Sequence, residues 1–294
     1  MAVPDDLVDA LVSSDGEAAF RTLDAAGALT AFIPELEAGR GFAQPELHYY
    51  DVLDHNLAAV AALDRALDPG EATGELRAAL DWIDFDESLG RDVGGLPLKA
   101  IIRLACLVHD VAKPHTAVVE DGRLRFPRHG PRGAEMLEER LPMLGFTPEA
   151  TVVVSRLVRY HLRPAELVKA WPVTDKAVRK FVTDLDGYVL PLMLVNLADG
   201  MATRGPTHTR QNYRMHCGIV NYVVARSVAV GDEGEPPLVT GDDLIHELSL
   251  ESGRLLGAVL TSVRRAQLEG TISKRDDALA LARSVAATLR AEPG

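Results

Sequence analysis

The chain has 294 residues, with 31 lysine and arginine side chains against 43 aspartate and glutamate side chains, and a formal net charge of −12 at pH 7. Hydrophobic residues make up 47% of the chain and aromatic residues only 5%. This balance excludes disordered and collagen-like chains and favours helix. Two cysteines are too few for a disulfide framework.

The acidic excess is unevenly distributed. Residues 1–95 carry 20 acidic and 5 basic side chains, whereas the remaining residues carry 23 acidic and 26 basic ones. The net charge of the later part of the chain therefore does not oppose binding of an anionic substrate. The acidic N-terminus lacks the basic start of a secretory signal, and the longest apolar stretch, VLPLMLVNLA, is shorter than the roughly 18–20 residues of a membrane span. We expect a cytoplasmic protein without a membrane partner.

Apolar periodicity predicts helix along nearly the whole chain. A short helical segment at 17–28 precedes an extended stretch with Pro and Gly, FIPELEAGRGFAQP, and a long helix follows at 49–67. Residues 70–95 give a weaker helical signal and are interpreted as a variable excursion. Further helices are predicted at 98–111, 133–141, 148–161, 176–185, 189–201 and 210–230.

One strand pair and a helical tail complete the expected order. TAVVEDGRLRF alternates around Asp121-Gly122, which predicts a small hairpin and is the single strand candidate. GDEGEPPLVTG, at 231–241, is interpreted as a linker, followed by helices at 242–248, 253–267 and 274–291. The predicted fold class is all-α. The predicted domains are a lead-in at 1–47, a central helical domain at 48–230, and the linker with a C-terminal helical tail at 231–294.

Side chains that commonly bind metals recur at the apolar faces or ends of the predicted helices. They are His55, His109, Asp110, His129, His161 and Asp199. Burying an unpaired carboxylate or imidazole is costly, and the usual remedy is a partner charge or a metal ion. Each position also has an ordinary explanation, because a single histidine is often a core or surface residue and Asp199 could cap a turn or pair with Arg204. The ordered set is harder to explain in this way.

In this order the residues resemble the H…HD…D signature of the HD-domain metal-dependent phosphohydrolases, through His55, His109-Asp110 and Asp199. The segments HYYDVLDHNL, LACLVHDVAKP, RHGPRGAEML, VRYHLRP and LADGMATRGP are similar to the HD region of bacterial CCA-adding tRNA nucleotidyltransferases. The similarity runs from about residue 20 to residue 289 and includes the tail. The resemblance implies that residues 48–230 form an HD-domain helical core.

The resemblance also has a departure. In that family a nucleotidyltransferase head, with a Gly-rich turn and a pair of metal-binding aspartates, precedes these segments. Here about twenty residues precede the similar region, and none of them resembles the head. We therefore expect no CCA addition by this chain alone.

The family pattern implies roles for individual residues. His55, His109 and Asp199 would hold one ion with Asp110, and Asp110 would bridge to a second ion held by His129 and His161. A mixed imidazole and carboxylate set favours divalent Mn, Fe, Co, Ni or Zn over Mg. Asp110 and Lys113 are the candidate catalytic residues, with Lys113 near the site water or a phosphate oxygen. Arg132 and Arg163 are candidate substrate-binding residues through bidentate hydrogen bonds to phosphate, although each could instead form a surface salt bridge.

The leading functional hypothesis is a metal-dependent phosphohydrolase, a phosphodiesterase or phosphatase acting on a small nucleotide phosphoester. Nucleoside 2′,3′-cyclic phosphates are the first candidate class. One alternative is a di-iron HD-type oxygenase on the same ligand set. Another is a tRNA- or RNA-binding relative of CCA-adding enzymes without transferase activity, although the tail lacks the interleaved aromatics of a single-strand RNA site. The native substrate, the number and identity of the ions, and the oligomeric state are left open.

Overall fold

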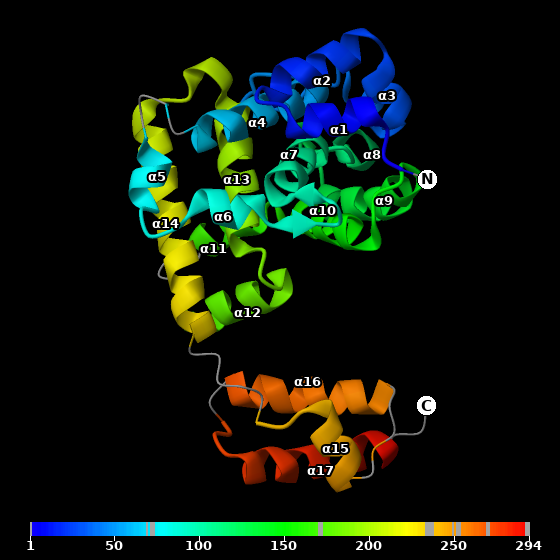
Figure 1. Cartoon of the computed structure of the whole chain (residues 1–294), viewed down its shortest axis with the longest axis vertical. Helices are drawn as coiled ribbons and strands as arrows, with labels where there is room; N and C mark the ends of the chain where they lie inside the picture. The colour runs from blue at the N-terminus through cyan, green and yellow to red at the C-terminus, as the bar shows by residue number, and fades with distance from the viewer. Residues whose placement is uncertain are drawn as a thin grey trace. The chain divides into compact units, whose positions relative to one another are not determined.

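The computed structural model describes residues 2–68, 70, 74–169, 173–232, 238–248, 250, 254–268 and 271–291. The described residues confirm the all-α class, with helices throughout and short hairpins between them (Figure 1). The chain divides into two compact units. The first comprises residues 1–173 and 181–225, and the second comprises residues 174–180 and 226–294, so the division passes through α12 (Asp175–Leu185) and α14 (Arg210–Asp232).

The first unit begins with small helices where the sequence predicted one helix and an extended stretch. These are α1 (Asp5–Val12), α2 (Gly16–Ala25), α3 (Ala28–Phe32) and the 3-10 helix η1 (Pro34–Gly39). The expectation of an extended segment at 32–45 is therefore wrong for its first half. Pro34 stands at the first position of η1, where its missing N–H would have no helical partner in any case.

The core helices follow the predicted order closely. They are α4 (Val52–Leu67), α7 (Leu98–Val108), α9 (His129–Met143), α10 (Pro148–Tyr160) and α13 (Val189–Arg204), with the shorter α8 (Lys113–Thr116) and α11 (Arg163–Lys169) between them. Helix α4 packs against α7 and α13, α10 packs against α7, and α9 packs against α10 (Figure 1). A helix that is apolar on nearly every face is buried, and α7 buries almost all of LKAIIRLACLV.

The segment predicted as a lead-in packs on this same core. Leu7 and Leu11 of α1 and Phe20 of α2 are fully buried in the main hydrophobic cluster. Helix α1 packs against α7, and α2 against α4. Burial of these side chains ties residues 1–47 to the first unit by the hydrophobic effect.

A buried arginine fixes this junction. Arg103 of α7 is 1% exposed and donates to the carbonyl oxygens of Leu11, at 2.6 Å, and Ser13, at 2.9 Å, and to the carboxylate of Asp64. A Cβ atom at Gly16 would lie 2.5 Å from the Arg103 Nε atom. Glycine at position 16 therefore leaves the space that the guanidinium occupies.

The described part of the chain contains two small antiparallel hairpins. β3 (Val118–Glu120) pairs with β4 (Arg123–Arg125) across Asp121 and Gly122, whose φ angles of 51° and 70° suit a two-residue hairpin turn. This confirms the predicted hairpin. β1 (Asp92–Val93) also pairs with β2 (Leu96–Pro97) around Gly94-Gly95, so the expectation of a single strand pair is wrong. A two-residue strand is too short to show an alternation of apolar and polar residues. The glycine pair, which is typical of a hairpin turn, was the sequence signal for this hairpin.

The excursion predicted at 70–95 contains short helices as well, α5 (Glu75–Ala79) and α6 (Phe85–Gly90). Their buried side chains, Leu76 and Phe85, join the core of the first unit. Residues 69 and 71–73 lie outside the described residues. Helix α13 is followed by the 3-10 helix η2 (Gly205–Thr207) and then by α14.

The second unit has its own apolar cluster on α15 (Gly241–Leu248), α16 (Arg254–Leu268) and α17 (Arg275–Ala291), with Leu244, Val259 and Ala278 fully buried. Of the predicted linker at 231–241, residues 233–237 lie outside the described residues. Among the helices that the structure describes, none is by itself long and apolar enough to cross a membrane, and one pair bent by 96° meets the criteria of length and composition when taken together.

Candidate metal centre

Six buried or nearly buried side chains meet where the core helices end. His55 lies in the first turn of α4, His109 and Asp110 directly follow α7, and Asp199 lies on α13. His129 begins α9 and His161 directly follows α10. Their ligand atoms form two groups, within each of which all atoms lie within 4.8 Å of one another: His55, His109 and Asp199 in the first group, and Asp110, His129 and His161 in the second.

The first group is compact. The Nε2 atoms of His55 and His109 are 3.1 Å apart. The Oδ1 atom of Asp199 lies 3.2 Å from the His55 Nε2 atom and 3.7 Å from the His109 Nε2 atom. All three side chains therefore direct a ligand atom at one point.

The second group has the same form, and Asp110 faces both groups. The Nε2 atoms of His129 and His161 are 3.1 Å apart, and Asp110 Oδ1 lies 3.2 Å and 3.6 Å from them. The other carboxylate oxygen of Asp110, Oδ2, lies 3.3 Å from the Nε2 atoms of both His55 and His109. One carboxylate thus offers a different oxygen to each group.

Backbone carbonyl groups set the tautomer of three of the histidines. The Nδ1 atoms of His109, His129 and His161 each lie 2.7–2.8 Å from the carbonyl oxygen three residues earlier. Because a carbonyl oxygen only accepts, each Nδ1 carries a proton, and Nε2 is the ring nitrogen that faces the centre. This is the arrangement in which imidazole binds a metal ion.

The arrangement of the six candidate ligands fits divalent metal ions. The Nε2 atoms of His129 and His161 are 3.1 Å apart and their ring protons lie on Nδ1, so their lone pairs repel unless a cation lies between them. Ligand atoms about 2.0–2.1 Å from a shared ion stand roughly 2.9–3.4 Å apart, close to the observed separations. Within the described residues, the Oδ1 atom of Asp110 is buried without a hydrogen-bond donor, and the ammonium of Lys113 lies against the Oδ2 atom.

The electrostatics of the centre also favour a cation. Burial opposes ionisation of Asp110, but His109 and Lys113 outweigh burial and hold its pKa well below the usual range. Burial also opposes protonation of His109, yet Asp110 and Asp199 raise its pKa to about 10. Burial and the nearby positive His109 lower the pKa of His161 to about 3. In the metal-free chain, His109 and Lys113 therefore supply the positive charge that metal ions would replace.

Lys113 is buried against the centre. Its side chain is 5% exposed, and its Nζ atom lies 2.5 Å from Asp110 Oδ2, 2.6 Å from Gln44 Oε1 and 3.4 Å from His48 Nε2. The sequence placed Lys113 at the site but not Gln44 or His48, which belong to the irregular segment before α4. That segment has no apolar periodicity. The only sequence signal for Gln44 and His48 was the presence of polar side chains shortly before the predicted ligand His55.

The two predicted phosphate-binding arginines lie close in sequence to ligands but are bonded elsewhere. Arg132 is exposed on α9 and donates to Glu135 at 3.1 Å. Arg163 pairs with Asp184 at 2.5 Å, and its guanidinium lies over the rings of Tyr160 and Phe181. In the described residues, neither guanidinium contacts one of the six candidate ligands.

Close packing of α9 on α10 brings the second group together. A Cβ atom at Gly130 would lie 2.9 Å from the carbonyl oxygen of Arg159, so only glycine permits this approach without movement. Arg128, just before α9, has a φ of 55°, a conformation that L side chains seldom adopt. The turn lets the His129 ring donate back to the carbonyl of Phe126.

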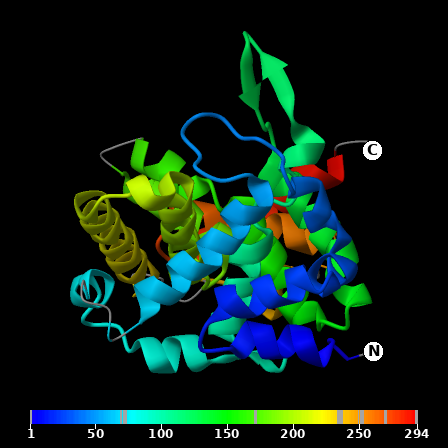
Figure 2. The same cartoon turned by 90° about the horizontal axis from the view of Figure 1, so that it is seen from above.

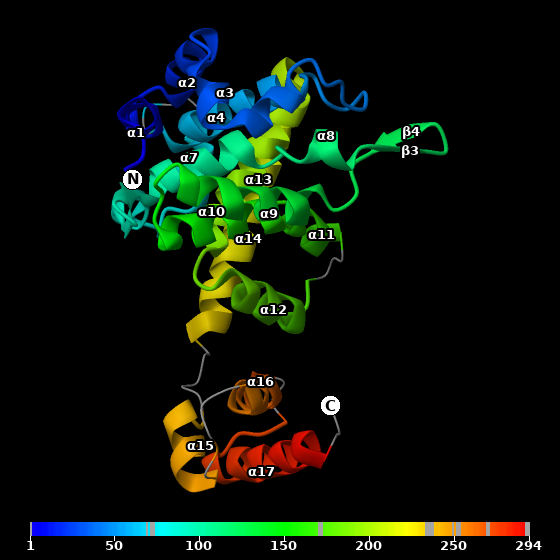
Figure 3. The same cartoon turned by 90° about the vertical axis from the view of Figure 1, so that its right-hand side faces the viewer.

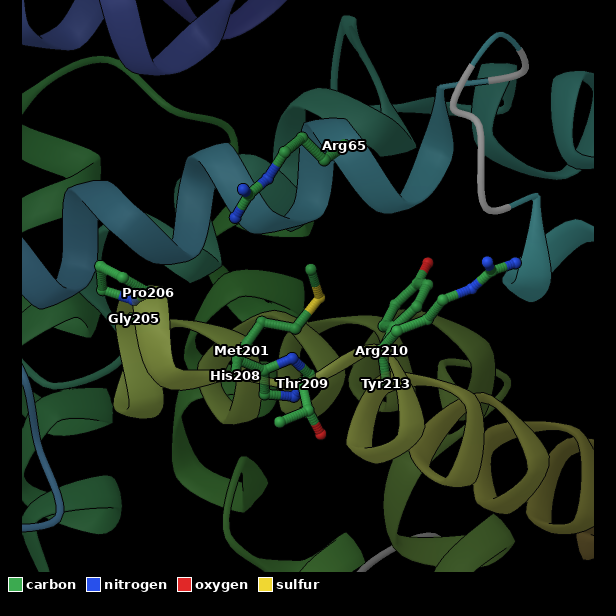
Figure 4. A pocket seen from close by; sticks show the side chains of 8 residues that line it. All are labelled: Arg65, Met201, Gly205, Pro206, His208, Thr209, Arg210 and Tyr213. Carbon is green, nitrogen blue, oxygen red and sulfur yellow. The ribbon is translucent and has the colours of Figure 1, made fainter.

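A separate pocket of about 260 Å³ lies between α4 and the segment from α13 to α14, lined by Arg65, Met201, Gly205, Pro206, His208, Thr209, Arg210 and Tyr213. Figure 4 shows the arginines pointing apart, and the Nε atom of Arg210 donates to Glu75 at 2.9 Å. The pocket contains none of the six candidate ligands.

Comparisons with known proteins agree with this geometry. Residues 86–202 match the family model of the HD domain. The chain is 29% identical over 282 residues, 95% of its length, to a CC-adding tRNA nucleotidyltransferase of Thermus thermophilus, and 28% identical over 285 residues to an A-adding tRNA nucleotidyltransferase of Deinococcus radiodurans. It spans 55% and 56% of the lengths of these relatives.

A third relative has a different activity in its name. Over 173 residues, 58% of this chain and 16% of the relative, the chain is 33% identical to a bifunctional uridylyltransferase/uridylyl-removing enzyme of Azospirillum brasilense. The chain therefore contains a segment that matches the HD domain, and it is similar over most of its length to bacterial tRNA nucleotidyltransferases. HD domains bind divalent metal ions, and the matched segment contains every candidate ligand except His55.

Proposed function

We propose that the protein hydrolyses nucleotide phosphoesters with two divalent transition-metal ions, held by His55, His109 and Asp199 on one side, by His129 and His161 on the other, and by Asp110 between them. The observation that supports this most is the position of Asp110, whose two oxygens face different ligand groups at 3.2–3.3 Å. Two ions bridged in this way would supply an activated water and offset the charge that develops at phosphorus.

The chain's own residues would bind and orient the phosphate. Lys113 is the candidate catalytic residue that reaches a phosphate oxygen, because its ammonium already lies at the bridging carboxylate. Arg163 lies two residues after His161, and its guanidinium is held by Asp184 and by two aromatic rings. These contacts fix the orientation of the N–H groups that could donate to a phosphate. Arg132 would have to leave Glu135 to reach a substrate. We keep both arginines as candidate phosphate ligands and expect the larger effect from Arg163.

The relatives support a nucleotide substrate. Two of their names describe addition of a nucleotide to tRNA, and a third describes removal of a uridylyl group. A phosphoester of a nucleotide is common to these reactions. We extend that chemistry to this chain, with nucleoside 2′,3′-cyclic phosphates as the first substrates to test.

A panel of substrates with a matched variant tests the proposal. The protein would be incubated with Mn²⁺, Co²⁺ or Ni²⁺ and with cyclic nucleotides, mononucleotides and dinucleoside polyphosphates. Asp110→Asn should abolish hydrolysis, because the amide cannot bridge two ions. Asp54→Asn, an exposed carboxylate one residue from His55, should not. A chelator should stop the wild-type reaction.

Two outcomes would contradict the proposal. Hydrolysis that survives both the chelator and Asp110→Asn would show that the centre is not responsible. No hydrolysis of any compound by protein with bound iron, together with oxygen consumption, would instead identify a di-iron oxygenase.

A further inference from the structure

The ammonium group of Lys113 has a complete set of partners. An ammonium has three N–H donors, and three acceptors surround this one: Asp110 Oδ2, Gln44 Oε1 and His48 Nε2. Because an ammonium group only donates, the Nε2 atom of His48 is the acceptor in this contact. Gln44 and His48 therefore hold Lys113 beside Asp110, and a metal ion at Asp110 Oδ2 would free the third N–H for a phosphate oxygen.

The segment that carries these two residues is tied down at both ends. We call residues 41–50 the entry loop. Asp51 accepts from the Gly41 amide at 2.8 Å, and the Val52 amide donates to the Phe42 carbonyl at 3.2 Å, so the loop closes on itself. The Tyr49 amide donates to the Thr203 carbonyl at 3.0 Å, which attaches the loop to α13 near Asp199. These bonds give the entry loop a defined geometry beside the centre.

Two partly exposed aromatic rings lie near each other beside the centre, and one of them belongs to the entry loop. The ring centroids of Phe42, in the entry loop, and Phe126, at the base of the β3–β4 hairpin, are 6.3 Å apart. The Lys113 ammonium lies 5.4 Å from the Phe126 ring centroid, and the His129 ring meets the same ring edge-on at 6.4 Å. Figures 2 and 3 show the loop and the hairpin on the same side of the first unit.

We propose that Phe42 and Phe126 bind the nucleobase of the substrate while Lys113, positioned by Gln44 and His48, binds its phosphate. A nucleotide carries a planar base close to a phosphate. Aromatic rings beside a fixed cation match these two parts, because the rings stack on the base and the cation binds the phosphate. This inference rests on the proposed function, because it assigns the substrate side of the same centre. It makes the entry loop a specificity element, and it excludes base-free phosphoesters as good substrates.

Equilibrium binding tests the inference without relying on hydrolysis. Calorimetric titration of Mn²⁺-loaded and metal-free protein would compare 3′-AMP with inorganic phosphate. Phe126→Leu keeps the apolar volume but removes the ring. Stacking of one base on an aromatic side chain is worth about 1–3 kcal/mol, so 3′-AMP should bind roughly 5- to 150-fold more weakly, with phosphate binding unchanged. Trp82→Leu, which removes an exposed ring elsewhere, should change neither affinity.

The positioning role of Gln44 has its own signature. Gln44→Leu removes an acceptor from Lys113 but leaves both rings in place. The affinities for 3′-AMP and for phosphate should therefore fall by the same factor, and the preference for the base should stay. A merely structural role would instead lower the melting temperature without this parallel loss.

The outcomes separate this inference from the proposed function. Hydrolysis of 2′,3′-cyclic AMP and of glycerol 1,2-cyclic phosphate at equal kcat/KM would overturn the base site and leave the hydrolase. Selective binding of 3′-AMP that Phe126→Leu removes would support the base site even in a protein that hydrolyses nothing. Unchanged 3′-AMP affinity in Phe126→Leu and in Phe42→Leu would overturn the inference.

Discussion

Replacing Lys113 by methionine should strengthen metal binding while weakening the metal-free protein. Lys113 and Asp110 are 5% and 1% exposed, and the ammonium lies 2.5 Å from the carboxylate oxygen that faces His55 and His109. An ammonium in that position competes with a metal ion for the same oxygen. Methionine keeps most of the side-chain volume and removes the charge.

The magnitude follows from the burial of the pair. Removing one partner of a buried ion pair costs about 3–5 kcal/mol because the other charge is left unpaired. In the metal-loaded protein an ion would supply the missing charge, and the loss should fall to about 1 kcal/mol, the worth of a hydrogen bond. By linkage the difference of about 2–4 kcal/mol corresponds to metal binding that is roughly 30- to 1000-fold tighter in Lys113→Met.

Urea unfolding with and without saturating Mn²⁺ would measure both free energies, and a competition titration would measure the affinity. Arg132→Met is the matched control, because it removes an exposed cation whose salt bridge is worth less than about 1 kcal/mol. Equal destabilisation of the loaded and metal-free forms by Lys113→Met would refute the idea that the lysine stands in for the ion's charge.

Three further predictions concern the frame of the centre. Arg103→Met should lower the free energy of unfolding by about 3–5 kcal/mol, since it leaves Asp64 and two carbonyl oxygens without their donor; chemical unfolding with the exposed Arg21→Met as control would check this. Burial lowers the pKa of His216 to about 4, so between pH 6.5 and 4 the unfolded chain binds a proton that the folded chain does not, and stability falls as pH falls. His216→Gln should remove up to about 3 kcal/mol of that loss, measured as the change in unfolding free energy between pH 7 and 4.5; an identical pH dependence would contradict it. Gly130→Ala should press α9 away from α10 and weaken one of two metal-binding steps by about 10- to 100-fold, which calorimetry with Mn²⁺ would resolve; two unaltered steps would count against it.

The sequence predicted the helical class and most core helices because their apolar periodicity is strong. α7 and α13 carry long apolar runs, and the side chains that follow those runs, His109, Asp110 and Asp199, were recognised as candidate ligands. The Asp121-Gly122 turn was equally clear, since it needs two residues that tolerate positive φ. The six candidate ligands lie in two groups in the structure, and their binding of metal ions stays a prediction.

The rest depended on contacts between distant segments. Gln44 and His48 reach Lys113 from a segment without periodicity, about 65–69 residues earlier in the chain. The salt bridge between Arg163 of α11 and Asp184 of α12 joins two residues that are 21 positions apart in the chain. Composition and spacing do not encode such pairings, because they arise from the packing of helices that each look ordinary alone. The β1–β2 hairpin was missed for a simpler reason, its two-residue length.

Metal content of the purified protein tests the central claim most directly. Elemental analysis of protein equilibrated with Mn²⁺, Co²⁺ or Zn²⁺ and then freed of excess ion should give about two ions per chain in the wild type. Asp110→Asn should lose most of this metal, because Asp110 is the shared carboxylate of both ligand groups. Metal content that is the same in Asp110→Asn as in the wild type, or a single ion in the wild type that persists in His129→Ala and His161→Ala, would contradict the two-metal centre.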